Sequence, residues 1–153
     1  MTLEEFHRVI QDAMGWCESH AHMFEIGDER IGTLHPRNDF VKDERKFTLE
    51  DVPLPRFEYW YDFGDNWYHD IHIVKEVPYD PNVAYPCCIK GKRACPLEDC
   101  GGIWGYKDIV DGYADGTISP SLKEWVEEDG GGPYDAERFD LAQVNEALRE
   151  RNF

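Results

Sequence analysis

The sequence has no long apolar run, few basic residues and no recognisable nucleophile motif. No stretch of its 153 residues approaches the roughly 18 apolar residues that cross a bilayer, so we expect no membrane association. Met1 to Glu5 lack the basic region and apolar core of a secretion signal, which favours a cytoplasmic protein with reduced cysteines. Ser19, Ser119 and Ser121 lack a nucleophile elbow or a recognisable base, which disfavours hydrolysis by a catalytic triad.

Acidic side chains outnumber basic ones, 32 against 16, which leaves a formal charge of −16. This charge repels phosphate backbones and anionic membranes, so we expect a protein partner rather than nucleic acid or a membrane. With 41% apolar and 14% aromatic residues, the chain is too apolar for disorder. Its length suits one core, so we expect a single domain over residues 1–153.

Local signals predict several helices. Thr2 and Glu5 form a capping box before a first helix that ends near Gly15, and Thr48 to Asp51 favour one further helical turn. Ser119 and Asp140 begin two later helices. The apolar positions are Leu3, Phe6, Ile10, Met14 and Cys17 in the first helix, Tyr106, Ile109, Val110 and Tyr113 in a middle one, and Leu141, Val144 and Leu148 in the last.

Alternating aromatic side chains over Phe57 to Phe63 give the strongest strand signal. A Gly64-Asp65-Asn66 turn follows, and Trp67 to Val77 return as the second strand of an antiparallel hairpin. Residues 23–26 and 31–34 predict short strands, and the polar stretch 36–46 predicts a loop. Together these elements predict an α+β fold, a small antiparallel sheet with helices packed on one face.

Four of the five cysteines lie between Pro78 and Gly102, in a segment without periodicity. Thiolates are preferred zinc ligands, and a metal can organise such a loop. We therefore expect zinc as a cofactor, held by Cys88, Cys95 and Cys100, with His20 or His22 as a candidate fourth ligand. The alternative is that these thiols are buried free cysteines, which behave as small apolar side chains.

Carboxylates and an imidazole gather around the hairpin turn, at Asp62, Asp65, His69 and Asp70. Such a group could bind a divalent cation or act as acid and base, but Asp, Gly and Asn are also the residues that turns require. The aromatic residues Tyr59, Tyr61, Trp67 and Trp104 could line a ligand groove, although aromatic strand faces are more often core.

Several motifs together point to a known family. They are Leu3-x-x-Phe6-His7, Met14-Gly15-Trp16, Tyr59-x-Tyr61-Asp62-Phe63-Gly64-Asp65-x-Trp67, Tyr85-Pro86, Ala94-Cys95-Pro96-x-Glu98-Asp99-x-Gly101-Gly102 and Gly105-Tyr106. In these motifs the chain resembles the Ri-plasmid open-reading-frame-three-like family (plasmid pRi ORF-3-like) over nearly its whole length. The resemblance implies no established activity. Some members lie in insertion elements and carry a resolvase-like name, but we find no serine or tyrosine recombinase signature here.

Two functions from different classes are compatible with these observations. The first is a non-enzymatic binding or interaction module of a plasmid- or mobile-element-associated family. The second is a metal-dependent enzyme acting on nucleic acid, resolvase- or nuclease-like. A cleft that joins Asp62, Asp65, His69 and Glu98 would favour this second function.

The family resemblance also implies a strand before the first helix. Since this chain opens on the helix cap, we expect Phe57–Phe63 to lie at an open sheet edge and predict a homodimer through it.

Overall fold

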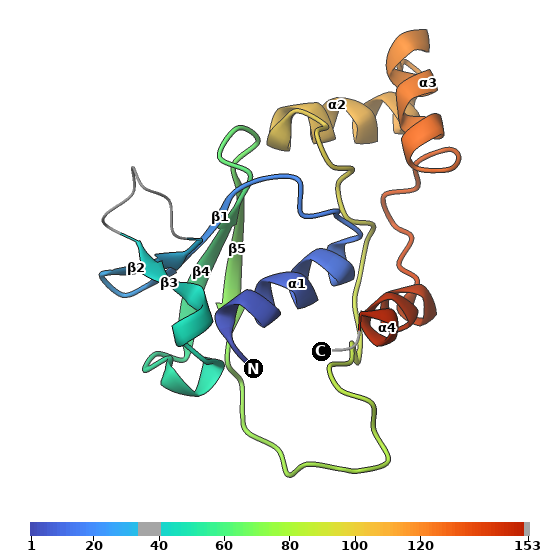
Figure 1. The fold of residues 1–153 in the computed structure, drawn as a ribbon. Coiled ribbons are helices and arrows are strands. Elements are labelled where there is room, and N and C mark those ends of the chain that lie inside the picture. Colours follow the sequence, from blue (N-terminus) through green and yellow to red (C-terminus); the bar gives the residue numbers. More distant parts are fainter. Residues whose placement is uncertain (34–40, 152–153) are drawn as a thin grey trace.

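A five-stranded sheet forms the centre of the computed structural model, which describes residues 1–33 and 41–151 (Figure 1). The elements are α1 (Leu3–Met14), β1 (His22–Ile26), β2 (Glu29–Gly32), β3 (Lys42–Asp43), 3-10 helices at Glu44–Lys46 and Leu49–Asp51, β4 (Arg56–Tyr61), β5 (Trp67–His72), α2 (Gly102–Asp115), α3 (Pro120–Asp129) and α4 (Leu141–Glu150). The predicted α+β class is confirmed.

The strand order is β3-β2-β1-β4-β5. All neighbours are antiparallel except β2 and β3, so the sheet is mixed rather than purely antiparallel. Phe24 of β1 lies opposite Tyr59 of β4, which places β4 between β1 and β5. The expectation that the aromatic strand forms an open edge is therefore wrong, because β1 occupies that side of it.

The main core lies between α1 and one face of the sheet. Leu3, Phe24, Tyr59 and Tyr61 have no exposed surface, and Phe57 retains 3%. The predicted alternation along β4 is thus confirmed, with Phe57, Tyr59 and Tyr61 on the buried face. The predicted capping box is also present, because the Thr2 hydroxyl accepts from Glu5 N while the Glu5 carboxylate accepts from Thr2 N.

The sequence predicts that the helices pack on one face of the sheet, but only some of them do. Helix α4 lies beside α1, where Arg151 pairs with Asp12 at 2.6 Å, but α2 and α3 lie beyond the tip of the β4–β5 hairpin (Figure 1). They enclose a second core around Ile109 and Val126, which Trp67 joins to the first. None of the helices within the described ranges has the length and apolar character needed to cross a membrane.

Several element boundaries differ from the sequence prediction. The aromatic strand ends at Tyr61, because Asp62 has a left-handed φ of 52°. Strand β5 ends at His72 rather than Val77, and the next residue makes one more bond to the neighbouring segment, from Ile73 N to Pro55 O. Part of the predicted loop 36–46 instead forms β3 and a 3-10 helix, while its residues 36–40, and residue 34 of the predicted strand, lie outside the described residues.

Candidate functional site

The cysteine-rich segment, residues 73–101, runs away from β5 and returns past α4 and the end of α1 to the hairpin tip (Figure 1). Different elements hold its cysteines. Cys88 N donates to Asn145 Oδ1 of α4 at 2.8 Å, and Cys95 Sγ lies 3.4 Å from Met14 Sδ of α1. Cys100 is buried at the start of α2.

These cysteines do not converge. No set of three close ligand atoms among residues 1–33 and 41–151 includes a thiol. Burial raises the pKa of Cys95, and burial followed by Asp65 raises that of Cys100 to about 11, so both thiols are neutral at pH 7. The structure therefore provides no preformed site from Cys88, Cys95 and Cys100, and zinc at these residues stays a prediction for metal analysis.

Glu98 fastens the end of this segment to the sheet. Its carboxylate accepts hydrogen bonds from Tyr61 Oη and from the amide and thiol of Cys17, the latter two at 2.9 and 2.8 Å. Burial opposes ionisation of Glu98, but the bonds from Cys17 and Tyr61 outweigh it and lower the pKa of this carboxyl. The same contact raises the pKa of Cys17, so its thiol is a hydrogen-bond donor rather than an activated nucleophile.

Asp65 provides a second attachment between the hairpin and the segment. Its Oδ2 accepts from Gly101 N at 3.0 Å, and its backbone oxygen lies only 2.5 Å from where a Cβ on Gly102 would sit. Gly102 also has a left-handed φ of 65°. Close backbone contact therefore explains Gly102 of the sequence motif, and a left-handed φ of 91° explains Gly101.

The four groups that would form an enzymatic cleft serve different contacts. Asp65 and Glu98 make the attachments described above, while His69 Nδ1 lies 3.2 Å from the Tyr59 carbonyl and burial lowers its pKa. Asp70, also predicted near this group, pairs with Arg56 across the strands at 2.6 Å. Within residues 1–33 and 41–151, no three of the four expected cleft residues bring their ligand atoms together.

A different ligand-like group does form at the tip. His20, from the segment after α1, brings its Nε2 within 2.8 Å of Asp99 Oδ1 and 3.7 Å of Asp62 Oδ2. Within the part of the chain that the structure describes, it is the one set of three or more His, Cys, Asp or Glu side chains with ligand atoms all within 4.8 Å. We call it the tip triad. The sequence analysis named Asp62 in the hairpin cluster and His20 as a candidate zinc ligand, but no local pattern indicated that the two side chains meet.

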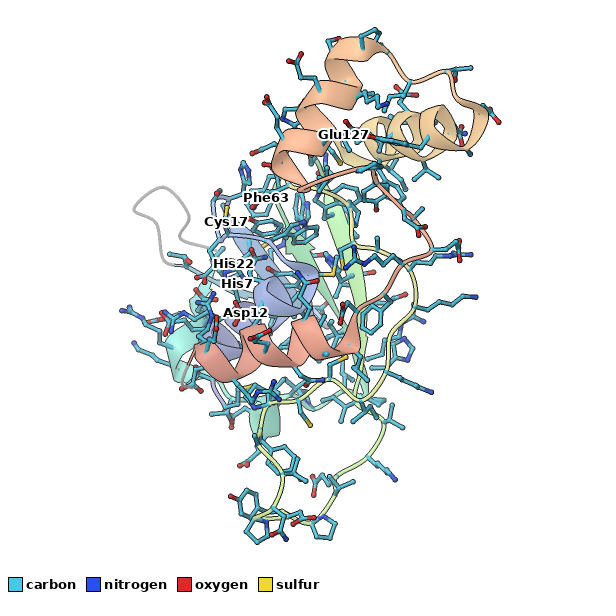
Figure 2. The ribbon with its side chains drawn as sticks, turned by 90° about the vertical axis from the view of Figure 1, so that its right-hand side faces the viewer. His7, Asp12, Cys17, His22, Phe63 and Glu127 are labelled. Atoms are coloured by element: carbon cyan, nitrogen blue, oxygen red, sulfur yellow. The ribbon has the colours of Figure 1, made fainter. Side chains whose placement is uncertain are left out.

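A buried polar network lies under α1, which sequence analysis missed. His7 Nδ1 lies 2.7 Å from Tyr59 Oη, and Gln11 Nε2 donates to the same oxygen at 3.1 Å. His7 and His22 lie next to each other (Figure 2), with their ring centroids 3.5 Å apart in a stacked arrangement. Glu44 accepts from His22 Nε2 at 2.6 Å. A signal was present, because His7 and Gln11 occupy the same helical face as the apolar residues of α1.

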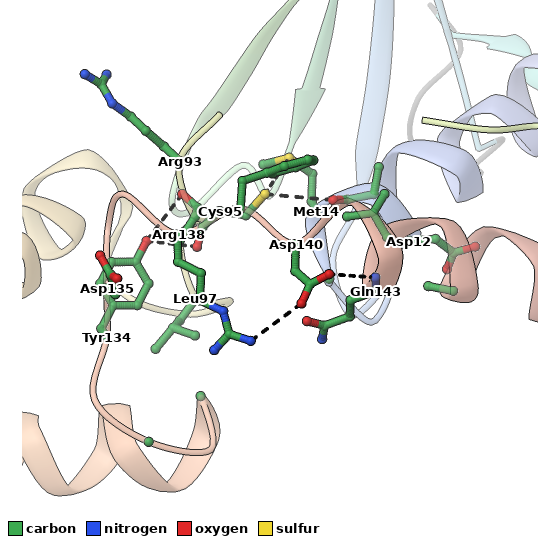
Figure 3. A pocket seen from close by; sticks show the side chains of 18 of the residues that line it. Asp12, Met14, Arg93, Cys95, Leu97, Tyr134, Asp135, Arg138, Asp140 and Gln143 are labelled. Atoms are coloured by element: carbon green, nitrogen blue, oxygen red, sulfur yellow. Dashed lines mark hydrogen bonds and ion pairs between the residues drawn. The ribbon is translucent and has the colours of Figure 1, made fainter. Parts of the chain in front are cut away.

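A cavity of about 290 Å³ lies between the end of α1, the cysteine-rich segment and the start of α4, and Figure 3 shows side chains that line it. Its charged side chains have partners of their own. Arg138 faces Asp140 at 3.8 Å, and Arg93 pairs with Glu137 at 3.3 Å. The volume is at the small end for ligand pockets, and no convergent polar group identifies a ligand class.

Helix α2 carries an exposed apolar face. Ile103 is 67% exposed and Trp104 76%. Together with Tyr106, Val110 and the stem of Lys107 they line a shallow surface hollow. Of the aromatic residues expected to line a groove, Tyr59 and Tyr61 are core, and Trp104 alone is strongly exposed.

Comparisons with known proteins agree with the sequence motifs. The profile of plasmid pRiA4b ORF-3-like proteins matches residues 1–143, and the chain belongs to this family. An uncharacterised protein of Sinorhizobium fredii, y4hQ, is 33% identical in an alignment that covers 95% of this chain and 77% of that one. A crystal structure of a protein of unknown function from Methanosarcina mazei Go1 superposes with a TM-score of 0.78 at 32% identity, covering 92% of this chain and 81% of the other.

Proposed function

We propose that this protein is a non-enzymatic interaction module that binds a protein partner through the exposed face of α2. The observation that carries the proposal is the pair Ile103 and Trp104, adjacent large apolar side chains that are 67% and 76% exposed. Exposed apolar surface rimmed by polar residues marks interaction sites, and tryptophan is enriched among residues that dominate binding energy. The proposal includes the cytoplasmic location and the plasmid or mobile-element association expected from the sequence.

The surrounding charge defines the chemistry of the partner. Asp111 borders the hollow, and further carboxylates of α2 lie nearby in the chain at Asp108 and Asp115. The whole chain carries −16. A partner segment with apolar side chains flanked by lysine or arginine would place apolar groups on Trp104 and cations beside these carboxylates. Nucleic acid offers the wrong charge for this surface.

Site-specific photocrosslinking tests the proposal. A photoreactive amino acid replaces Lys107, which borders the hollow and pairs with Asp111. The matched control carries it at Lys123 of α3, which is similarly exposed and pairs with Glu127 in the same i,i+4 arrangement. We expect one partner to be crosslinked in cells from position 107 and not from position 123.

The purified partner then provides the quantitative measurement. Trp104→Ala should weaken its binding at least tenfold, because truncating a central tryptophan removes most of its contact area. Tyr79→Ala, at a residue 77% exposed in the cysteine-rich segment, should leave the affinity unchanged. Equal crosslinking from both positions, or equal affinity of the Trp104→Ala variant and the unaltered protein, would refute the assignment of this face.

A further inference from the structure

The tip triad joins three segments that are far apart in the chain. His20 follows α1, Asp62 directly follows β4, and Asp99 lies just before α2. One ligand atom from each residue lies within 4.8 Å of the other two, and His20 Nε2 faces Asp62 Oδ2 and Asp99 Oδ1. The group thus combines one imidazole nitrogen with two carboxylate oxygens.

Hydrogen bonding does not explain this approach. His20 Nε2 is shielded from solvent and has no hydrogen-bond partner, although Asp99 Oδ1 lies only 2.8 Å away. The distance is that of an ion pair, but the angle does not meet hydrogen-bond geometry. Buried polar atoms in native proteins almost always have a partner, so the orientation of this nitrogen needs another explanation.

Asp62 provides a second, independent observation. Its side chain is only 9% exposed, and its Oδ1 accepts from Gly64 N at 2.9 Å. Among the hydrogen bonds of residues 1–33 and 41–151, none reaches Asp62 Oδ2, which instead faces His20 Nε2 at 3.7 Å. An unpaired carboxylate oxygen of a largely buried side chain, directed at a buried, unpaired imidazole nitrogen, favours a cation between them.

The two separations from His20 agree with ligation of a single ion. Bonds from zinc to nitrogen or oxygen are about 2.0–2.2 Å long, so two ligands of one ion lie about 3.0 Å apart at right angles and about 3.4 Å apart at the tetrahedral angle. The distances from His20 Nε2, 2.8 Å to Asp99 and 3.7 Å to Asp62, lie on either side of these values. Asp99 is 66% exposed, which leaves the triad accessible from solvent.

We propose that His20, Asp62 and Asp99 bind one divalent transition-metal cation, with Zn²⁺ as the best match. Imidazole suits Zn²⁺, whereas Mg²⁺ and Ca²⁺ prefer sites made only of oxygen ligands. Three protein ligands leave a coordination position for water. The ion joins the segment after α1, the sheet and the end of the cysteine-rich segment at one point, and its binding is independent of the face of α2.

Calorimetric titration of chelator-treated protein with ZnCl₂, MnCl₂ and MgCl₂ tests the site. We expect one Zn²⁺ per chain, weaker binding of Mn²⁺ and no measurable binding of Mg²⁺. Asp99→Asn should weaken Zn²⁺ binding at least tenfold, and because Asp99 is exposed the variant should fold normally. The matched control is Asp70→Asn, which alters a half-exposed carboxylate of the same hairpin that pairs with Arg56 and should keep the affinity.

A spectroscopic measurement separates this site from the cysteines. Co²⁺ bound by nitrogen and oxygen has no thiolate charge-transfer band in the near ultraviolet, whereas Co²⁺ bound by cysteine does. We expect no such band in the unaltered protein. Absence of Zn²⁺ binding, binding unchanged in Asp99→Asn, or a thiolate band that disappears in Cys95→Ser would each overturn the proposal.

Discussion

Mild acid should destabilise the protein through one buried imidazole, that of His7. Burial lowers its pKa from the ordinary 6.5 to about 3, with further contributions from the positive charge of neighbouring His22, Arg8 and Arg151. The contact with Tyr59 agrees with a neutral ring, because Gln11 donates to the tyrosine oxygen and leaves the hydroxyl proton free to bond His7 Nδ1.

The sign and size follow from proton linkage. The unfolded chain takes up a proton on His7 as the pH falls below 6.5, while the folded chain resists this until about pH 3, so stability is lost across that window. Between pH 7.5 and pH 5 the loss amounts to about 2 kcal/mol. The carboxyls of Asp43, Asp51 and Asp70, whose pKa values are lowered by hydrogen bonds, lose their contributions only at lower pH.

Urea unfolding at both pH values measures this effect. His7→Gln keeps a hydrogen-bonding side chain opposite Tyr59 but cannot titrate, so its loss of stability should be about 2 kcal/mol smaller than that of the unaltered protein. Burial of His69 lowers its pKa too, and its contribution cancels in this difference. His72→Gln, at an exposed position, should retain the full loss. Equal pH dependence of His7→Gln and the unaltered protein would refute the reasoning.

Four further outcomes are expected. Tyr59→Ala should cost about 3–5 kcal/mol in urea unfolding because its side chain is fully buried, whereas Tyr68→Ala, at a residue 57% exposed, should cost less than about 1 kcal/mol. Gly105→Ala should lower the free energy of unfolding by at least about 1–3 kcal/mol, since the new Cβ would lie 1.7 Å from the Cys100 carbonyl oxygen; an unchanged urea midpoint would contradict this. If the cysteine-rich segment binds zinc, elemental analysis of protein with an altered tip triad should still find one ion, and free reactivity of all the segment's thiols would argue against it. Light scattering at micromolar concentration tests the homodimer, which a monodisperse monomer would exclude.

Elements with a local cause could be predicted from the sequence. The capping box of Thr2 and Glu5 identified the start of α1, and Ser119 and Asp140 cap α3 and α4 as expected. The alternation in β4 gave the buried face correctly, because a strand's side chains alternate whatever its neighbours are. These signals depend on a few adjacent residues, and tertiary structure does not override them here.

Strand order could not be obtained in the same way. An alternating pattern states which face is buried, but not which strand lies alongside. In the structure β1 pairs with β4, so that Phe24 faces Tyr59, and β5 takes the edge that we had assigned to the aromatic strand. The exposed residues of β5 include Asp70, which pairs with Arg56. Charged side chains of this kind on an edge strand discourage edge-to-edge association. The homodimer prediction therefore loses its original structural reason while its experimental test stands.

The candidate metal ligands show how residues that are close in sequence can lie apart in the fold. Cys88 and Cys95 are seven residues apart in a segment that runs past α4 and α1, and seven residues of extended chain span up to about 25 Å. Each thiol thus meets a different element. His20 and Asp99 are distant in sequence, yet the bonds of Glu98 and Asp65 to the tip hold their segments together. Ligand-type residues in one loop predict a site only where that loop folds back on itself, and this segment instead brings Asp99 next to His20 and Asp62 of other segments.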